Sequence, residues 1–213
     1  MEFFTIVGTG MGLKETILPD GKKAIEEADL LIAGERNLEP WKNEDKEFHI
    51  IKSNLKETMD LIQREYKTKK IVVLVSGDPG FYSLLNYISK FFNRQQIKVI
   101  PGISSMQMAF SRVALSWHDA ILLNLHGRDI NTINPHKHSL KVGMLTDPIN
   151  NALLICEHLI KQEAKNFTVF ICSNLGYNDE SVLEFKLYEY SKIHINPALP
   201  AVMILLDEEK NEL

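Results

Sequence analysis

Short apolar segments, rich in β-branched residues, recur along the chain and predict strands. Most of them carry apolar residues at consecutive positions, so both faces of each strand would be covered, as in a parallel sheet flanked by helices. The pattern predicts nine strands, at residues 3–7, 30–33, 48–51, 70–75, 97–100, 120–125, 142–146, 167–172 and 202–206.

Between these segments the apolar residues follow a helical period instead. One stripe has steps of four, three and four residues and predicts a helix with Ser53 as its N-cap. That stripe consists of Leu55, Met59, Ile62 and Tyr66. Two similar stripes are Leu84, Ile88, Phe91 and Phe92, and Ile149, Leu153, Cys156 and Ile160. Strands that alternate with helices of this length indicate βαβ units, so an α/β fold is predicted.

Nine strands are many for a single sheet, and the chain offers a division near its middle. Residues 115–123 pass from a helical segment into a new strand, and residues 126–141 are polar without an apolar period. We therefore predict two α/β domains with largely parallel central sheets. The N-terminal domain is placed at residues 1–117 and the C-terminal domain at residues 118–213.

Composition narrows the classes of function. The 213 residues are 45% hydrophobic and 24% charged, as in ordinary globular proteins. A net charge of −4 and a pI near 6.0 lack the basic excess of nucleic-acid-binding proteins, so no such partner is expected. No apolar stretch approaches the roughly 18 residues of a membrane helix, and the first residues do not resemble a signal peptide. A cytoplasmic protein without a membrane partner is expected.

No metal site is predicted. Cys156 and Cys172 lie in apolar segments sixteen residues apart, without the close pairing of zinc ligands, and are expected to be buried thiols. The sequence "HKH" at residues 136–138 has no second cluster of ligands, so a solvated loop is expected there.

The first predicted strand ends in the glycine-rich sequence "VGTGMG" at residues 7–12. A dinucleotide-binding fingerprint needs a third glycine at the position of Leu13, followed at once by a helix, and the chain provides neither. A nicotinamide-dependent oxidoreductase is therefore disfavoured. The glycines serve either the geometry of the turn alone or contact with a ligand.

The fourth predicted strand ends in "SGDPGFYSL" at residues 76–84. Pro79 suits the first position of a helix, and Asp78 would then be its N-cap. The same aspartate lies at the carboxyl end of a parallel strand, where open α/β sheets bind ligands. The loop lacks the Lys-Ser/Thr ending of a P-loop. Both interpretations of Asp78 remain open from this segment alone.

Two further turns carry candidate chemistry. In "PGISSMQMA" at residues 101–109, Ser104 and Ser105 open a predicted helix, either as caps or as ligand contacts. Because carboxyl ends of parallel strands lie on one side of the sheet, this turn and the two glycine turns before it are expected to line one cleft. In "NLHGRD" at residues 124–129, His126 and Arg128 flank a glycine and offer donors suited to carboxylates.

Taken in order, these segments resemble the tetrapyrrole methylase family, S-adenosylmethionine-dependent enzymes of corrin and sirohaem synthesis. The resemblance runs from residue 3 to about residue 206. The GDP and PGIS turns are typical of the whole family. The extension "GDPGFYSL", with "SWHDA", "LHGRD" and "NLGYNDE", indicates the branch that methylates a meso carbon, carbon 5, of a cobalt-precorrin in cobalamin biosynthesis. Activity on another precorrin carbon or on a non-tetrapyrrole substrate is the alternative.

The resemblance implies two α/β domains flanking a cleft that holds S-adenosyl-L-methionine, usually in a homodimer. The cofactor contacts that it implies are Gly10, Met11, Gly77, Asp78, Phe81, Ser104, Ser105, Asn174, Leu175, Pro200 and Ala201. One departure concerns the loop "GMGLKETILPDG", which lacks the family's usual "GPG" followed by a Leu-Thr pair. Contacts from that loop are therefore less secure than those of the GDP turn.

The expected substrate is a tetrapyrrole that carries several acetate and propionate groups, so local positive charge is needed. His126 and Arg128 are the first candidates for binding it, followed by Arg36 and Arg112. The residues identify no general base, and a methyl transfer to an electron-rich carbon depends mainly on positioning. A separate decarboxylating methyltransferase is expected as a partner, because no decarboxylase domain follows the methylase.

Overall fold

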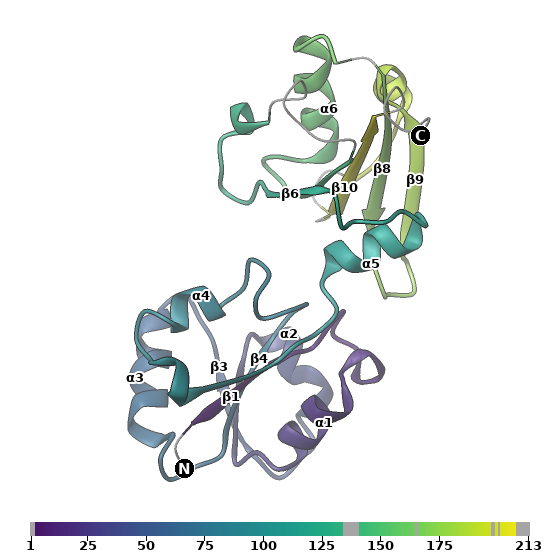
Figure 1. Ribbon diagram of the computed structural model, residues 1–213. Coiled ribbons are helices and arrows are strands. Elements are labelled where there is room, and N and C mark those ends of the chain that lie inside the picture. The colour runs from purple at the N-terminus through teal and green to yellow at the C-terminus, as the bar shows by residue number, and fades with distance from the viewer. Residues whose placement is uncertain (1–2, 134–140, 165, 197–198, 200, 208–213) are drawn as a thin grey trace. The chain divides into compact units, whose positions relative to one another are not determined.

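The computed structural model describes residues 3–133, 141–164, 166–196, 199 and 201–207. The chain forms two compact units, Met1–Ser104 and Ser105–Leu213, each built around its own sheet (Figure 1). The predicted architecture of two α/β domains is confirmed.

The first unit contains a five-stranded sheet in the order β3-β2-β4-β1-β5, and all of its pairings are parallel. Its strands are β1 (Phe4–Gly8), β2 (Leu30–Ala33), β3 (Glu47–Ile50), β4 (Ile71–Val75) and β5 (Ile97–Ile100). Each coincides with a predicted strand to within one residue at either end. The expectation of a parallel sheet is confirmed for this unit.

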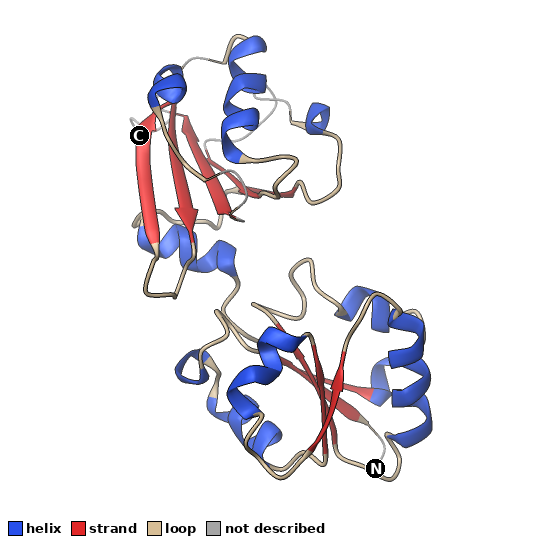
Figure 2. Cartoon of the chain, turned by 180° about the vertical axis from the view of Figure 1, so that it is seen from behind, coloured by secondary structure: helices blue, strands red, loops and turns tan. Residues whose placement is uncertain are grey.

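Helices cover both faces of this sheet (Figure 2). They are η1 (Lys14–Thr16), α1 (Pro19–Glu26), α2 (Glu35–Leu38), η2 (Glu39–Trp41), α3 (Leu55–Glu65), α4 (Leu85–Ile88) and η3 (Arg94–Gln96). Successive strand residues point to opposite faces, so Ile6 and Val73 pack towards α3 and α4. Their neighbours Val7 and Val72 pack with residues of α1, α2 and η2 on the other face.

Helix α3 starts one residue later than its predicted cap implies. The side-chain oxygen of Asn54, and not that of Ser53, accepts from the backbone N–H of Glu57 at 3.4 Å. Serine and asparagine are about equally good N-caps, so adjacent residues of these types leave the helix start undetermined in the sequence. Met59 and Ile62 are buried as the stripe predicts.

The second unit contains a five-stranded mixed sheet in the order β6-β7-β10-β8-β9. Its strands are β6 (Ile121–Asn124), β7 (Lys141–Leu145), β8 (Phe167–Ser173), β9 (Ser181–Lys186) and β10 (Ala201–Asp207). Within the described part of this unit, β6 and β7 pair in parallel and the other pairings are antiparallel. The prediction of a largely parallel sheet is therefore wrong for this unit, because strands buried on both faces look alike in either direction.

Strand β9 has no counterpart among the predicted strands. It lies at the edge of the second sheet, and its first four residues are exposed, including Val182 and Leu183. An exposed edge strand shows neither a continuous apolar run nor a clean alternation. Its pairing with β8 makes it a strand.

Helices also cover the sheet of the second unit. They are α5 (Ser105–Arg112), η4 (Ile130–Thr132), α6 (Ala152–Lys161) and η5 (Leu187–Lys192). Helix α6 is capped by Asn151 and buries Ala152, Ile155, Cys156 and Leu159. Of the predicted stripe, Cys156 is buried, whereas its first member, Ile149, is 76% exposed.

Helix α5 packs on β7 and β10, which explains why the units divide earlier than predicted. A Cβ added at Gly143 would lie 2.4 Å from Met106 Sδ and 2.8 Å from Phe110 Cε2. This glycine in β7 lets the helix approach the sheet closely. The contacts divide the chain between Ser104 and Ser105, whereas the sequence placed the division between residues 117 and 118. Residues 105–117, which contain α5, therefore belong to the second unit and not to the first.

The cap of α3 supplies a test of the first unit's stability. We expect Asn54→Ala to lower the free energy of unfolding by about 0.5–1 kcal/mol, because a backbone N–H loses its partner. Ser53→Ala is the matched control and should change it by less than about 0.3 kcal/mol, which is small for a cap. Urea unfolding followed by Trp41 fluorescence, in a Trp117→Phe background, measures both variants. Equal losses would show that Asn54 is not the cap.

Candidate functional site

Three glycine-containing turns meet at the carboxyl edge of the first sheet. They follow β1, β4 and β5, which are neighbours in the order β4-β1-β5. The expectation that these turns lie on one side of the sheet is confirmed. Open α/β sheets bind their ligands at this edge.

The turns after β1 and β4 are joined through their backbones. Gly10 N–H donates to the Gly77 carbonyl at 3.2 Å, and Gly77 N–H donates to the Gly10 carbonyl at 2.7 Å. Gly10 and Gly77 have φ values of 59° and 66°, a conformation that glycine adopts without strain. No long helix opens on these glycines, since η1 is a single 3₁₀ turn and α1 begins at Pro19. The structure thus lacks the helix of a dinucleotide-binding turn.

The end of β1 is covered by backbone from both neighbouring turns. A Cβ added at Gly8 would lie 2.6 Å from both Gly102 N and Gly77 O. A Cβ added at Gly102 would lie 2.3 Å from Gly77 O and 2.8 Å from Gly8 O. Since backbone atoms cannot move aside as a flexible side chain can, these two positions require glycine.

Asp78 does not cap a helix, because α4 begins only at Leu85. Its Oδ1 accepts from Gly80 N–H at 2.8 Å within the same turn. Its Oδ2 accepts from Gly102 N–H at 3.1 Å, in the turn after β5. The N-cap interpretation is therefore wrong: the carboxylate binds two turns together. A carboxylate has about four acceptor positions, so Asp78 keeps acceptor capacity for a ligand.

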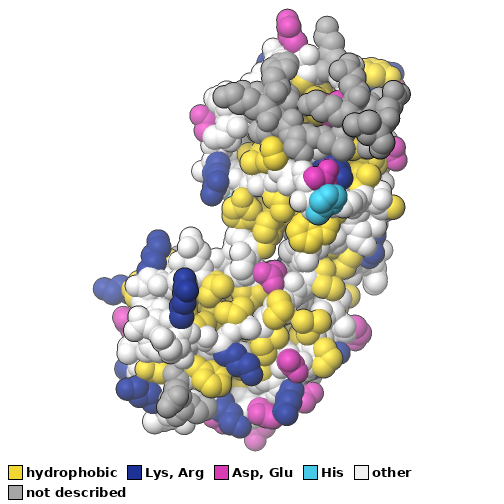
Figure 3. All heavy atoms as spheres, in the orientation of Figure 1, with side chains coloured by type: hydrophobic (Ala, Val, Ile, Leu, Met, Phe, Trp, Pro, Cys, Tyr) yellow, Lys and Arg dark blue, Asp and Glu magenta, His cyan; other side chains and the backbone are white. Residues whose placement is uncertain are grey.

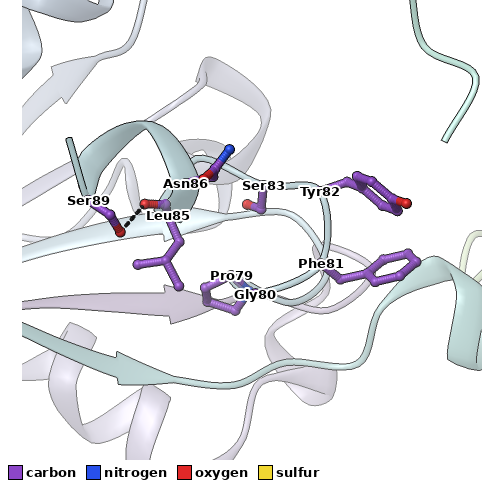
Figure 4. Close-up of a pocket in the computed structure, with 8 residues that line it drawn as sticks. All are labelled: Pro79, Gly80, Phe81, Tyr82, Ser83, Leu85, Asn86 and Ser89. Carbon is purple, nitrogen blue, oxygen red and sulfur yellow. Dashed lines mark hydrogen bonds between the residues drawn. The ribbon is translucent and has the colours of Figure 1, made fainter. Parts of the chain in front are cut away.

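The loop after Asp78 presents two aromatic rings. Phe81 and Tyr82 are in edge-to-face contact, with ring centroids 4.8 Å apart. Both rings project from the loop on the side away from α4 (Figure 4). Together with Ser83 and Asn86, they line a cavity of about 520 Å³. Tyr82 has a φ of 49°, which costs about 1–3 kcal/mol for a residue other than glycine. Strain of this kind clusters at functional sites.

The remaining predicted residues of the first unit differ in exposure. Arg36 is exposed, and its Nη2 donates to Ser76 Oγ at 3.5 Å, next to the GDP turn. Met11 and Ser104 are buried. Ser105 is the first residue of α5, as the sequence predicts for a helix opened by these serines.

The loop that departs from the family pattern is held by hydrogen bonds within it and by contacts to Trp41 and Glu44. Thr16 Oγ1 donates to the carbonyls of Leu13 and Thr9, at 2.8 and 3.2 Å. Lys14 Nζ lies 4.0 Å from the centre of the Trp41 ring and 3.3 Å from a Glu44 carboxylate oxygen. These contacts fix the segment that carries Gly10 and Met11.

In the second unit, the remaining candidate residues also share one sheet edge. The carboxyl ends of β6, β7 and β8 lie at this edge, together with the amino end of the antiparallel β10. This pairing brings together His126 and Arg128, Asn174 and Leu175, and Ala201. Pro200 lies outside the described residues.

The turn with His126 and Arg128 is held by residues that the sequence analysis did not identify. Gly127 N–H donates to Asp147 Oδ2 at 2.9 Å. Asn150 Nδ2 donates to the carbonyls of Leu125 and Arg128, at 2.8 and 2.9 Å. A signal was present, since "DP" follows a predicted strand at residues 147–148 as it does at residues 78–79.

Asp147 is buried and ionised. Its carboxylate accepts from the N–H groups of Asn150, Gly127 and Ile149, and these hydrogen bonds lower its pKa below the ordinary value despite the opposing effect of burial. The side chains of His126 and Arg128 are exposed above this turn. This edge of the second sheet thus presents the exposed side chains of His126 and Arg128 on a turn that the buried carboxylate of Asp147 holds by a hydrogen bond.

Arg112 is paired with an acid of the turn that follows β8. Its Nε and Nη2 both donate to the carboxylate of Glu180, with Nη2 at 3.2 Å from Oε2. Glu180 Oε2 also accepts from Gly176 N–H at 2.6 Å, and both partners lower the pKa of Glu180. Arg112 therefore supports the turn after β8, where Asn174 has a φ of 50° and donates to Asp179.

The segment "SWHDA" forms a cluster at the opposite edge of the second sheet, before β6 and β7. Ser116 Oγ lies 2.7 Å from His118 Nδ1, and Asp119 Oδ1 lies 3.6 Å from the same nitrogen. A serine triad needs the serine and the acid on different ring nitrogens. This cluster therefore does not form a nucleophilic triad.

Among the described residues, no group of three or more His, Cys, Asp and Glu side chains is arranged to hold a metal ion. The "HKH" segment falls outside that part of the chain. Burial raises the pKa of the Cys156 and Cys172 thiols to about 12, so neither is a nucleophile at neutral pH. No helix in the described ranges is long and apolar enough to cross a membrane.

The glycine packing at the first edge predicts a large effect of one methyl group. We expect Gly102→Ala to lower the free energy of unfolding of the first unit by about 3 kcal/mol or more, since the new Cβ overlaps backbone. Gly34→Ala is the control: a Cβ there meets nothing within 4 Å, and its cost should stay below about 1 kcal/mol. Urea unfolding followed by Trp41 fluorescence compares them. Similar costs would refute the close packing.

Residues 4–191 match the family of tetrapyrrole (corrin/porphyrin) methylases. The chain is 33% identical over 184 residues to the probable cobalt-precorrin-7 C(5)-methyltransferase of Methanocaldococcus jannaschii, covering 83% of this chain and 86% of the relative. It is 29% identical over 178 residues to the cobalt-precorrin-7 C(5)-methyltransferase of Salmonella typhimurium, covering 84% of this chain and 88% of the relative.

A solved structure shares the fold. The uroporphyrin-III C-methyltransferase of Thermus thermophilus, complexed with S-adenosylhomocysteine, has a TM-score of 0.75 at 18% identity. The match covers 96% of this chain and 97% of that one. The chain therefore belongs to the tetrapyrrole (corrin/porphyrin) methylase family, whose members are S-adenosylmethionine-dependent C-methyltransferases.

Proposed function

We propose that this protein transfers a methyl group from S-adenosyl-L-methionine to carbon 5 of cobalt-precorrin-7 in cobalamin biosynthesis. The names of two relatives that span most of the chain support this substrate. The observation that carries the proposal is the set of three interlocked glycine turns at the carboxyl edge of the first sheet.

The first edge fits a sulfonium nucleoside. Gly10 and Gly77 adopt positive φ values without strain, which lets the turns after β1 and β4 bond to each other at this edge. Asp78 retains acceptor positions suited to ribose hydroxyls or an ammonium group. Phe81 adds an aromatic face for a planar base. The proposed contacts of this unit are Gly10, Met11, Gly77, Asp78, Phe81 and Ser104, and those of the second unit are Ser105, Asn174, Leu175, Pro200 and Ala201.

When bound, S-adenosylmethionine supplies an electrophilic methyl group. The residues of this chain then have to orient the two reactants, and such positioning can remove about 7–11 kcal/mol of a barrier. The hydrogen-bonded turns around Gly77, Asp78 and Gly102 provide rigid backbone for that task. We assign no general base to this chain.

The substrate's acetate and propionate groups call for cationic side chains in the proposed site. His126 and Arg128 are exposed on the turn after β6, and Arg36 is exposed beside the GDP turn. Arg112 is already bound to Glu180 by two donors, so a substrate carboxylate would have to displace that partner. We assign substrate binding first to His126 and Arg128 and then to Arg36, because the side chains of all three are exposed.

The proposal includes a cytoplasmic homodimer that works beside a separate decarboxylating methyltransferase.

The distribution of charge bears on the class of substrate. Basic and acidic side chains are interspersed on the face of each unit seen in Figure 3. Together with the net charge of −4, this favours a small-molecule substrate over nucleic acid.

Methyl transfer from S-adenosylmethionine with a carbon-13 methyl group tests the proposal. With cobalt-precorrin-7 as the substrate, we expect NMR to place the label on carbon 5 of the methylated product, and precorrins already methylated at that carbon should take up none. Label at another carbon, or in no precorrin, would contradict the proposed substrate.

Calorimetric titration with S-adenosylhomocysteine and with NAD separates a methylase from an oxidoreductase, because the proposal predicts binding of the first compound only.

Removal of the Arg128 guanidinium should weaken substrate binding alone. We expect Arg128→Ala to raise KM for cobalt-precorrin-7 about tenfold, as for a lost charge-assisted hydrogen bond, with little change in kcat. The Kd for S-adenosylhomocysteine should stay within about twofold of the wild-type value. Arg64→Ala, at an exposed position of α3, removes the same charge as a control. Equal weakening of both ligands would defeat this assignment.

A further inference from the structure

The segment between β7 and α6, residues 146–151, supports the turn that carries His126 and Arg128. Five hydrogen bonds of the Asp147 and Asn150 side chains join the two segments or shape the supporting one. Asp147 Oδ2 accepts from Gly127 N–H at 2.9 Å, across 20 residues of sequence. Asp147 Oδ1 accepts from the N–H groups of Ile149 and Asn150, at 2.9 and 2.6 Å.

Asn150 completes the connection from the other side. Its Nδ2 donates to the Leu125 carbonyl at 2.8 Å and to the Arg128 carbonyl at 2.9 Å. The turn is thus held at three points: at Leu125, before His126; at Gly127, between the two basic residues; and at Arg128 itself. Gly127 has a φ of 62°, so the bond to its N–H fixes a left-handed turn.

Asp147 and Asn150 are each only 6% exposed. They lie below the turn and offer little surface to a ligand. Any effect they have on binding must therefore act through the position of the turn.

We propose that Asp147 and Asn150 are positioning residues that hold His126 and Arg128 in the arrangement that binds the carboxylates of the substrate. This inference rests on the proposed function, and it adds two buried residues that the exposed surface of the site does not indicate. The buried carboxylate replaces water as the acceptor for Gly127 N–H, so the turn is ordered before substrate arrives. Ordering before binding lowers the entropy cost of binding.

The proposal predicts an effect on substrate binding without an effect on the chemical step. In Asp147→Asn the amide oxygen can replace only one carboxylate oxygen, and the amide NH₂ then faces an N–H donor. The turn loses at least one hydrogen bond, and KM for cobalt-precorrin-7 should rise about tenfold while kcat stays within about twofold. The Kd for S-adenosylhomocysteine should be unchanged.

Asp129→Asn is the matched control. Asp129 lies next to Arg128, but its carboxylate accepts from Asn131 of its own loop and makes no bond to Gly127. The substitution removes the same charge from the residue next to Arg128 in the sequence, so a KM near the wild-type value separates positioning from electrostatics. Hydrogen exchange at Gly127 N–H supplies a readout that does not need activity: it should become faster in Asp147→Asn and not in Asp129→Asn.

The outcomes distinguish the inference from the proposed function. A wild-type chain that does not methylate cobalt-precorrin-7 would defeat the proposed function and the inference with it. Active wild type, faster exchange at Gly127 and an unchanged KM in Asp147→Asn would overturn the inference alone, as would an equal rise in KM for Asp129→Asn. If Asp147→Asn does not fold, Asn150→Ala keeps the Asp147 carboxylate and its N–H donors. That variant should raise KM severalfold, and a wild-type KM would overturn the inference.

Discussion

The hydrogen bond from Gly102 N–H to the Asp78 carboxylate organises the ligand-binding edge of the first sheet. It joins turns that follow β4 and β5, although β1 lies between these two strands. The two turns can meet only because β1 ends in Gly8, where a Cβ would overlap Gly77 O and Gly102 N. Three glycines and one carboxylate thus form a single packing unit, and each member depends on the others.

The second unit uses the same device on a different topology. Asp147 follows β7 and accepts from Gly127 N–H in the turn after β6. In both units, an aspartate at the end of one strand orders a glycine turn of another strand. A buried carboxylate that accepts several N–H bonds stays ionised, as the lowered pKa of Asp147 indicates. Asp147 therefore supports its turn structurally instead of taking part in proton transfer.

This arrangement suits a reaction that needs orientation more than acid–base chemistry. Both thiols are buried with a pKa of about 12. The cluster of Ser116, His118 and Asp119 lies at the sheet edge away from the candidate residues and lacks triad geometry. What the two edges do offer is rigid backbone, an aromatic pair and exposed cations, which are the parts needed to hold a nucleoside and a polycarboxylate macrocycle.

The sequence by itself determined the nine main strands, the α/β class, the family and the turns at which ligands are expected. These features follow from local periodicity and from short motifs. The sequence did not determine β9, because its exposed Val182 and Leu183 give it the pattern of a loop. It also did not determine that β10 runs antiparallel to its neighbours β7 and β8. Strands covered on both faces carry the same apolar pattern in either direction.

Only the tertiary structure decided the partners of the polar side chains. Asp78 looked like a helix cap, yet it accepts from Gly102, 24 residues away. Arg112 looked available for substrate, yet it binds Glu180, 68 residues away. The division of the units before α5 has the same origin, since Gly143 in β7 admits that helix. Local sequence reports which groups can donate or accept, whereas the folded topology brings distant partners within hydrogen-bonding distance.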